Sequence, residues 1–212
     1  MTDELSLDEL ERDALTEVVN IGVSRAAAAL RKMVGQQVLL SVPAVEIVTY
    51  KAAAALIGQR ENDELIAVRQ DFGGAFSGRA LLIFPESRSL EVVRAVAGDN
   101  VPVEDLPELE VEALAEIGNV ILNNCLGTMA NMLQQPLKMT LPHVVRGNGE
   151  DLFALPSETP DEAGLVLFLY INFSFRDCNI RGYIAMLMDL PSLSALRLLI
   201  ADFIARVTAD TD

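Results

Sequence analysis

Apolar residues recur at three- and four-residue steps along residues 6–34, and again from about residue 109 to residue 134. This spacing is typical of a helix that packs one side against a core. For the first helix, the expected buried positions are Leu15, Val18, Gly22, Ala26, Ala29 and Met33. A shift of 99 residues gives those of the second helix, namely Leu114, Ile117, Ile121, Cys125, Thr128 and Met132. The pattern therefore predicts two long helices with matching buried sides.

Extended segments rich in Val, Ile and Leu follow each long helix, and this composition favours strands. We expect strands at residues 37–48 and 137–145, and pairs of strands within 64–84 and 164–188, the former around a turn at Gly73-Gly74. Shorter helices are expected at residues 52–57, 87–97 and 191–207. In the second half, a polar loop at residues 147–162 is expected to replace the first of these short helices.

The order of elements is nearly the same in both halves of the chain. This repetition predicts one domain over residues 1–212, made of two repeats at about 6–99 and 107–207. Consecutive strands without long crossover helices favour antiparallel pairing. We therefore expect an α/β (α+β) fold with a pseudo-twofold axis, in which one mostly antiparallel sheet carries two long exposed helices.

A polar pattern is repeated together with the apolar one. It reads acid, three residues, Glu, two residues, Asn, twenty-two residues, Pro, and its copies are Asp13, Glu17, Asn20, Pro43 and Glu112, Glu116, Asn119, Pro142. Two residues turn a helix by about 200°, so each Glu and Asn should point away from the buried stripe. They are three residues apart and hence neighbours on one face. Because a duplicated core would need only the apolar stripe, the polar residues indicate two copies of a site.

An exposed Glu with an Asn one turn later suits few kinds of chemistry. Neither is a good nucleophile at neutral pH, and a metal site would need more carboxylates or a histidine. A side-chain amide has a donor and an acceptor and can hold a water molecule, as the water-orienting Gln of nucleotide hydrolases does. The carboxylate could pair with a lysine of a partner. The pair therefore suits hydrolysis of a phosphoryl group held by another protein, although one Glu-x-x-Asn alone indicates nothing.

Composition and charge narrow the class of partner. The net charge of -15 disfavours binding to nucleic acid and to anionic membranes, which attract basic surfaces. Cys125, Cys178 and the single His143 lack the spacing of a zinc site, and Cys125 should be a small buried residue. The acidic N-terminus is unlike a signal peptide, and the apolar stretch at 163–175 is too short for a membrane helix. We expect a cytoplasmic protein.

Two segments resemble the signature helices of the CheC family, the CheC/CheX/FliY group of chemotaxis phosphatases. They are Glu17-Val-Val-Asn20-Ile-Gly and Glu116-Ile-Gly-Asn119-Val-Ile-Leu-Asn-Asn-Cys-Leu-Gly127. The family pattern begins with Asp or Ser, so the first copy matches throughout and the second departs from it at Glu112. The resemblance covers nearly the whole chain and is to the CheC type, which has two copies of the motif.

The resemblance implies dephosphorylation of the phosphorylated response regulator CheY or a similar receiver. Asn20 and Asn119 would each orient the attacking water at the aspartyl phosphate. Glu17 and Glu116 would each pair with a lysine of the receiver domain.

The remaining motif residues would have supporting roles. Asp13 and Glu112 would support the helix face or the contact, and Pro43 and Pro142 would shape a strand. The resemblance implies no metal or cofactor of the protein's own, because the magnesium ion would belong to the receiver.

Three alternatives stay open at this point. A non-catalytic adaptor could use the same helix faces to dock a receiver domain or the deamidase CheD. A flagellar motor role like that of FliY is disfavoured because the chain ends at Asp212, without an added motor domain. A CheX-like protein is expected to be shorter and to carry one copy of the motif.

Overall fold

The computed structural model describes residues 7–35, 37–61, 64–98, 101–154, 165–175 and 178–209. The elements of the first half are α1 (Glu9–Val34), β1 (Val38–Thr49), α2 (Tyr50–Arg60), β2 (Leu65–Gly74), β3 (Gly78–Pro85), the 3-10 helix η1 (Glu86–Arg88) and α3 (Ser89–Ala97). Those of the second half are η2 (Val103–Asp105), α4 (Leu106–Met132), β4 (Leu137–Met139), β5 (His143–Gly147), α5 (Gly149–Phe153), β6 (Leu165–Phe175), β7 (Cys178–Met188) and α6 (Leu190–Ala209).

Local signals fix both ends of α1. The side chain of Asp8 accepts a hydrogen bond from the Glu11 backbone N–H at 2.7 Å, and the Glu11 side chain accepts one from the Asp8 N–H at 3.0 Å. Such a capping box satisfies two backbone donors that a helix start leaves without partners. At the other end Gly35 has φ 67°, a conformation that glycine adopts without strain. The helix predicted at residues 6–34 is confirmed, with a start at Glu9.

The described strands form one sheet in which every pairing is antiparallel, as expected. Their order is β1-β6-β7-β3-β2-β4, and β5 also pairs with β2. β1 of the first half borders β6 of the second, while β4 and β5 of the second half border β2 of the first. Each half therefore completes the sheet of the other. This exchange favours one domain made of two repeats, a division that stays a prediction.

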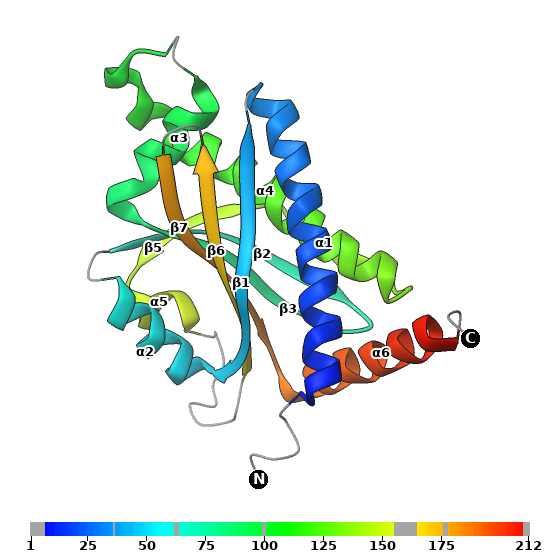
Figure 1. Cartoon of the computed structure of the whole chain (residues 1–212). Coiled ribbons are helices and arrows are strands. Elements are labelled where there is room, and N and C mark those ends of the chain that lie inside the picture. The colour runs from blue at the N-terminus through cyan, green and yellow to red at the C-terminus, as the bar shows by residue number, and fades with distance from the viewer. Residues whose placement is uncertain are drawn as a thin grey trace.

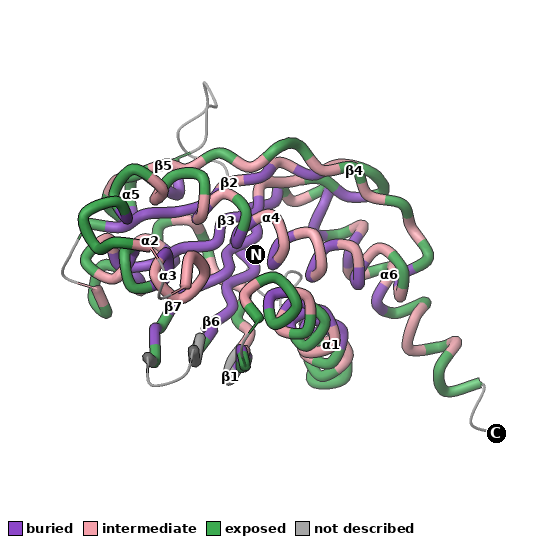
Figure 2. The backbone as a smooth tube through the Cα atoms, turned by 90° about the horizontal axis from the view of Figure 1, so that it is seen from above, coloured by how far each residue is buried: buried purple, intermediate pink, exposed green. Residues whose placement is uncertain are grey.

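Helices cover both faces of the sheet. Alternate residues of a strand point to opposite faces, and the strand residues divide accordingly between two hydrophobic cores. The larger core lies under α1, α3, α4 and α6, and the smaller one under α2 and α5. Figure 1 shows α1 beside β1 with α4 crossing behind it, and α2 next to α5. In Figure 2 the strands are mostly buried, whereas α1 has an exposed outer side.

The predicted buried stripes are confirmed at most positions. Eleven of the twelve positions are buried or partly buried, among them Thr128, which is 2% exposed. Met33, by contrast, is 37% exposed, and Leu30 is the last buried residue of α1. Cys125 is buried as expected, and burial raises the pKa of its thiol to about 12.

Close contacts at two glycines bring α4 near its neighbours. A Cβ atom at Gly22 would lie 2.9 Å from the Cα atom of Cys125, which is where α1 and α4 meet. A Cβ atom at Gly118 would lie 2.3 Å from the side chain of Val68 on β2. Both distances are too short for a larger residue, so these glycines allow α4 to lie close to α1 and to the sheet.

Two expectations about the strands are wrong in detail. The strand predicted at 137–145 is divided into β4 and β5, and Pro142 lies in the irregular segment between them. Proline lacks the N–H that a strand ladder needs, which accounts for the interruption. The turn expected at Gly73-Gly74 comes later, because both glycines still pair, with Lys138 and Leu137.

The polar loop expected at 147–162 contains a helix, α5. Asn148 caps it by accepting from the Asp151 N–H at 3.0 Å, while the Asp151 side chain accepts from the Asn148 N–H at 3.1 Å. α5 packs against α2, so the second half does have a short helix at this place. Residues 155–162 of the predicted loop lie outside the described residues.

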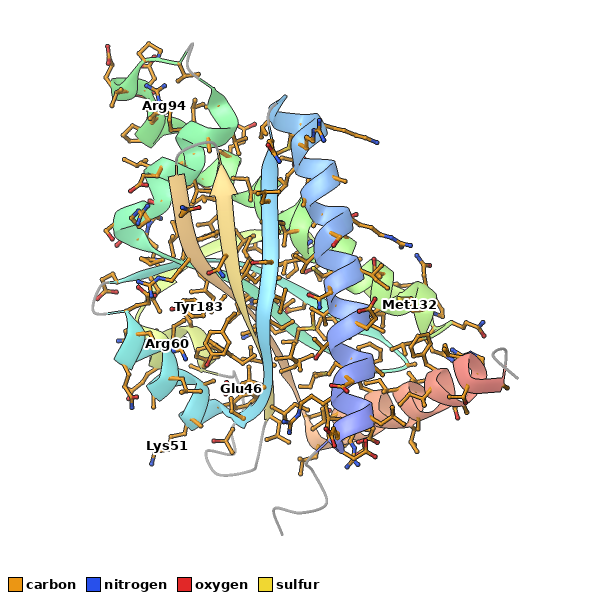
Figure 3. All side chains as sticks on the ribbon, viewed as in Figure 1. Glu46, Lys51, Arg60, Arg94, Met132 and Tyr183 are labelled. Carbon is orange, nitrogen blue, oxygen red and sulfur yellow. The ribbon has the colours of Figure 1, made fainter. Side chains whose placement is uncertain are left out.

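Two arginines secure the chain near the ends of the larger helices. Arg94 of α3 donates to the carbonyl oxygens of Gly98 and Val101, on either side of the junction between the halves (Figure 3). Arg206 of α6 donates to the carbonyl oxygen of Met132 at 3.0 Å, at the end of α4 (Figure 3). A cation near the last carbonyl groups of a helix stabilises that end.

Candidate functional site

The first motif lies on the solvent side of α1. Asp13 and Glu17 are exposed and Asn20 is partly exposed, whereas Leu15 and Val18 are 1% exposed. The packing of the apolar stripe therefore turns these three polar side chains outward. No other residue in the described ranges forms a hydrogen bond with the Asn20 side chain. Its amide donor and its acceptor are both available to water or to a partner.

The second motif lies on α4 and differs at its amide. Glu112 and Glu116 are exposed and Asn119 is partly exposed. The Asn119 Oδ1 atom accepts a hydrogen bond from Gln70 Nε2 at 3.3 Å and another from Asn123 Nδ2 at 2.7 Å. Gln70 comes from β2 and is 1% exposed. The second Asn is thus held by two further amides, and the first is not.

Gln70 and Asn123 are absent from the sequence motif. Two signals could have drawn attention to them. Asn123 is one helical turn after Asn119, and Gln70 stands on the same side of β2 as the buried Ile66 and Val68, where a polar residue is unusual. The crossing of α4 over β2 brings the three amides together, and no sequence pattern predicts this crossing.

Of the two motif prolines, Pro43 lies in a strand, as expected, and Pro142 lies between two strands. Pro43 is within β1, where the pairing with β6 changes register between Ser41 and Ala44. Pro142 is partly exposed, just before β5. The segment before Pro142 is tied to the second motif, because the Thr140 carbonyl oxygen accepts from Gln70 Nε2 at 2.9 Å. Pro142 is therefore two residues away from a residue that is hydrogen-bonded to the second motif's surroundings, and it takes no part in the described hydrogen bonds itself.

An ion-pair group adjoins the same segment. Asp71 pairs with Arg79 at 2.9 Å and with Arg69 at 3.3 Å, and its backbone N–H donates to Thr140 Oγ1 at 3.0 Å. Partial burial opposes ionisation of Asp71, but the two arginines outweigh it and lower the pKa of this carboxyl group. The ion pairs thus lie within β2 and between β2 and β3, while hydrogen bonds between Asp71 and Thr140 join β2 to the segment before Pro142.

The face of the sheet under α2 holds other polar groups and a groove. Tyr183 donates to Glu61, and the guanidinium of Arg60 lies 4.2 Å from the centre of the Tyr170 ring (Figure 3). These contacts join α2 to the sheet and are structural. The groove, of about 770 Å³, lies between α2 and α5, and its lining includes small residues such as Ala54, Ala55 and Gly58.

No group of three or more His, Cys, Asp or Glu side chains in the described ranges could hold a metal ion. No helix of that part of the chain is long and apolar enough to cross a bilayer.

Two family models match this chain. The one described as chemotaxis phosphatase CheX matches residues 66–160, and the one described as CheC-like family matches residues 10–47. The first match contains the second motif from Glu112 to Pro142, and the second contains the first motif from Asp13 to Pro43.

Similar proteins carry related names. The flagellar motor switch phosphatase FliY of Bacillus subtilis is 24% identical over 140 residues, which are 65% of this chain and 36% of FliY. The match thus spans about a third of that relative. The CheY-P phosphatase CheC of the same organism is 23% identical over 141 residues, 65% of this chain and 67% of CheC.

Solved structures share the fold at low sequence identity. FliY of Thermotoga maritima has a TM-score of 0.71 and 17% identity, with 93% of this chain and 98% of that one covered. The FliM middle domain of Vibrio alginolyticus has a TM-score of 0.60 and 12% identity, with 87% and 99% covered. These likenesses concern the fold and leave the activity to the site. The matching family models and the named relatives all belong to the CheC/CheX/FliY group, so the resemblance seen in the motif residues is confirmed.

Proposed function

We propose that this protein hydrolyses the aspartyl phosphate of a phosphorylated CheY-like response regulator. One observation carries the proposal: α1 and α4 each present an exposed Glu with a partly exposed Asn one turn later on the same side. Relatives named as phosphatases in the same family support this class of reaction. Glu17, Asn20, Glu116 and Asn119 would carry it out.

In this mechanism each Asn holds the attacking water. An amide can accept a proton of the water or donate to its oxygen, and so aim the free lone pair at the phosphorus atom. The water oxygen bonds to phosphorus while the bond from phosphorus to the aspartyl oxygen breaks. The electron pair of that bond returns the receiver aspartate to its carboxylate form. The protons of the water leave with inorganic phosphate and solvent.

The carboxylates would position the receiver. Glu17 and Glu116 are exposed on the same side as their Asn partners, where each can meet a lysine of the receiver. Asp13 and Glu112 lie one turn earlier on the same helix faces and extend the acidic contact surface. The magnesium ion that neutralises phosphoryl charge would come with the receiver.

Phosphate release tests this proposal. We expect Asn20→Ala and Asn119→Ala each to lower turnover of a phosphorylated receiver partially, and the double variant to abolish it. Removing one positioned polar group lowers the rate at its own site by roughly a hundredfold or more. Asn131→Ala is the matched control, because Asn131 is an exposed residue of α4 outside the motif.

Binding measured in parallel separates catalysis from docking. A catalytic role predicts that the double variant still binds the receiver, since the Glu residues remain. If the double variant releases phosphate as fast as the unaltered protein, the assignment of Asn20 and Asn119 is wrong. If neither the unaltered protein nor the variants release phosphate although all of them bind, the protein is an adaptor.

A further inference from the structure

The hydrogen bonds around Asn119 have a defined direction. A carbonyl oxygen can only accept, so the Gln70 atom that lies 2.9 Å from the Thr140 carbonyl oxygen must be the nitrogen Nε2. The same nitrogen lies 3.3 Å from the Asn119 side chain, which must therefore turn its oxygen toward Gln70. Asn123 Nδ2 donates to this oxygen as well, at 2.7 Å.

This arrangement decides what Asn119 can offer. An amide oxygen has two lone pairs, and both now have donors within the protein. The Nδ2 group of Asn119 forms no hydrogen bond with any residue in the described ranges and belongs to a partly exposed side chain. Asn119 is therefore held as a hydrogen-bond donor, with its N–H groups available to a water or a phosphoryl oxygen.

Stability alone does not explain the two supporting amides. Within the described part of the chain, Gln70 Oε1 and Asn123 Oδ1 are buried without a hydrogen-bond partner. A buried acceptor without a partner destabilises a fold, and an apolar residue of similar size would avoid this loss. A function that needs Asn119 in one orientation gives a reason for keeping both amides.

The first motif lacks both supports. The shift of 99 residues relates Asn123 to Ser24, which is exposed. The same shift relates Thr140 to Ser41. Thr140 is hydrogen-bonded to Asp71, and Ser41 pairs with Asn172, so Asn172 corresponds to Asp71. The residue before each of these is Gln70 in the first case and Ile171 in the second, so Ile171 corresponds to Gln70. Ile171 is 1% exposed and has no polar side-chain atom. The counterpart of the buried amide is thus apolar.

We infer that Gln70 and Asn123 are positioning residues that hold the Asn119 amide with its nitrogen outward, so that the second site acts through a fixed donor and the first through a free amide. This inference rests on the proposed phosphatase function. It makes the two sites unequal. The side-chain amide of Asn119 is already oriented before the receiver binds, whereas that of Asn20 becomes oriented only on binding. Pre-organised groups lose less freedom when the reacting complex forms.

Single-site proteins provide the test. In an Asn20→Ala background, where the second site acts alone, we expect Gln70→Met to lower kcat about tenfold, the effect of one lost hydrogen bond, and to leave KM unchanged. Asn123→Ala should act in the same direction. In an Asn119→Ala background, where the second site is already lost, Gln70→Met should have no further effect.

A second measurement is independent of turnover. The NMR order parameter of the Asn119 side-chain NH2 group should be high, that of Asn20 low, and Gln70→Met should lower the Asn119 value toward the Asn20 value. The melting temperature should not fall, because methionine fills the space and removes the unpaired Gln70 Oε1, while Thr140 is exposed to water and Asn119 Oδ1 keeps its bond from Asn123.

The outcomes separate the two proposals. Equal loss of kcat in both backgrounds, or a high Asn119 order parameter that survives Gln70→Met, would overturn the positioning role. A normal kcat in Asn20→Ala with Gln70→Met would overturn it as well. Turnover that persists in the Asn20→Ala, Asn119→Ala double variant would instead refute the proposed function.

Discussion

Gly22 of α1 lies directly against the backbone of Cys125 of α4, so that a Cβ atom at Gly22 would come within 2.9 Å of the Cys125 Cα atom. Both motifs precede this contact on their own helices, with Asn20 two residues before Gly22 and Asn119 six residues before Cys125. The spacing of α1 and α4 at this point therefore determines where the two proposed sites stand on the surface of the molecule.

Substitution of Gly22 should separate the helices. We expect Gly22→Ala to lower the free energy of unfolding by about 1–3 kcal/mol, because the added carbon meets backbone that cannot rotate away. Gly127→Ala on α4 is the control, since nothing lies within 4 Å of its would-be Cβ atom and alanine favours a helix. Urea unfolding measures both. Equal stabilisation by the two changes would contradict the close contact at Gly22.

Charge reversal of the motif carboxylates should weaken receiver binding. We expect Glu17→Lys with Glu116→Lys to raise the Kd for a phosphorylated receiver about tenfold, because each lysine would repel the cation that the carboxylate attracts. Asp202→Lys is the control for net charge, since Asp202 is exposed on α6. A similar change in Kd from Asp202→Lys would indicate a general charge effect and not a contact.

Leu141 should contribute apolar contact at the second site. It is 79% exposed and follows Thr140, whose carbonyl oxygen is bonded to Gln70 beside Asn119. We expect Leu141→Ser to weaken receiver binding in an Asn20→Ala background by roughly fivefold or more, with no loss of stability. Leu198→Ser, at a residue 70% exposed on α6, should leave binding unchanged. Unchanged binding in Leu141→Ser would place the contact elsewhere.

Cys125 should be unreactive in the folded protein. Its pKa of about 12 leaves almost no thiolate at pH 8, and its sulfur is enclosed. In a Cys178→Ser variant, iodoacetamide should label Cys125 in strong urea and leave it unlabelled in buffer, as followed by mass spectrometry. Rapid labelling in buffer would show that the contact between α1 and α4 opens readily.

Asp71 should make stability depend on pH in the acid range. Its pKa is lower in the folded protein than in the unfolded chain, where it is about 4. The stabilisation is therefore complete above pH 4 and disappears as the pH falls through the folded value. The difference in unfolding free energy between the unaltered protein and Asp71→Asn should be largest near neutral pH and should shrink below pH 4. A difference that is the same at pH 3 and pH 7 would show that the ion pairs do not matter.

The sequence predicted those features that depend on local periodicity. The stripe through Leu15 and Val18 is sufficient to place Glu17 and Asn20 on the other side of α1, because a helix fixes the angles between neighbours. The antiparallel sheet also followed from the order of the elements. The family resemblance added roles for the motif residues, which no contact in the fold assigns.

Features that depend on distant packing were missed. Gln70 reaches Asn119 across 49 residues of chain, through the crossing of α4 over β2, and nothing near Gln70 in the sequence signals this. The division between β4 and β5 depends on how the segment around Pro142 meets β2. α5 falls in a segment whose sequence predicts a loop, because five residues are too few to show a helical period.

The decay of a phosphorylated receiver under single-turnover conditions, with this protein at saturating concentration, tests the central claim most directly. The account predicts that the unaltered protein speeds the loss of phosphate, while the Asn20→Ala, Asn119→Ala variant binds equally well and leaves the receiver to decay at its own spontaneous rate. Decay that remains fast in the fully bound double variant would contradict the claim that these two amides orient the attacking water.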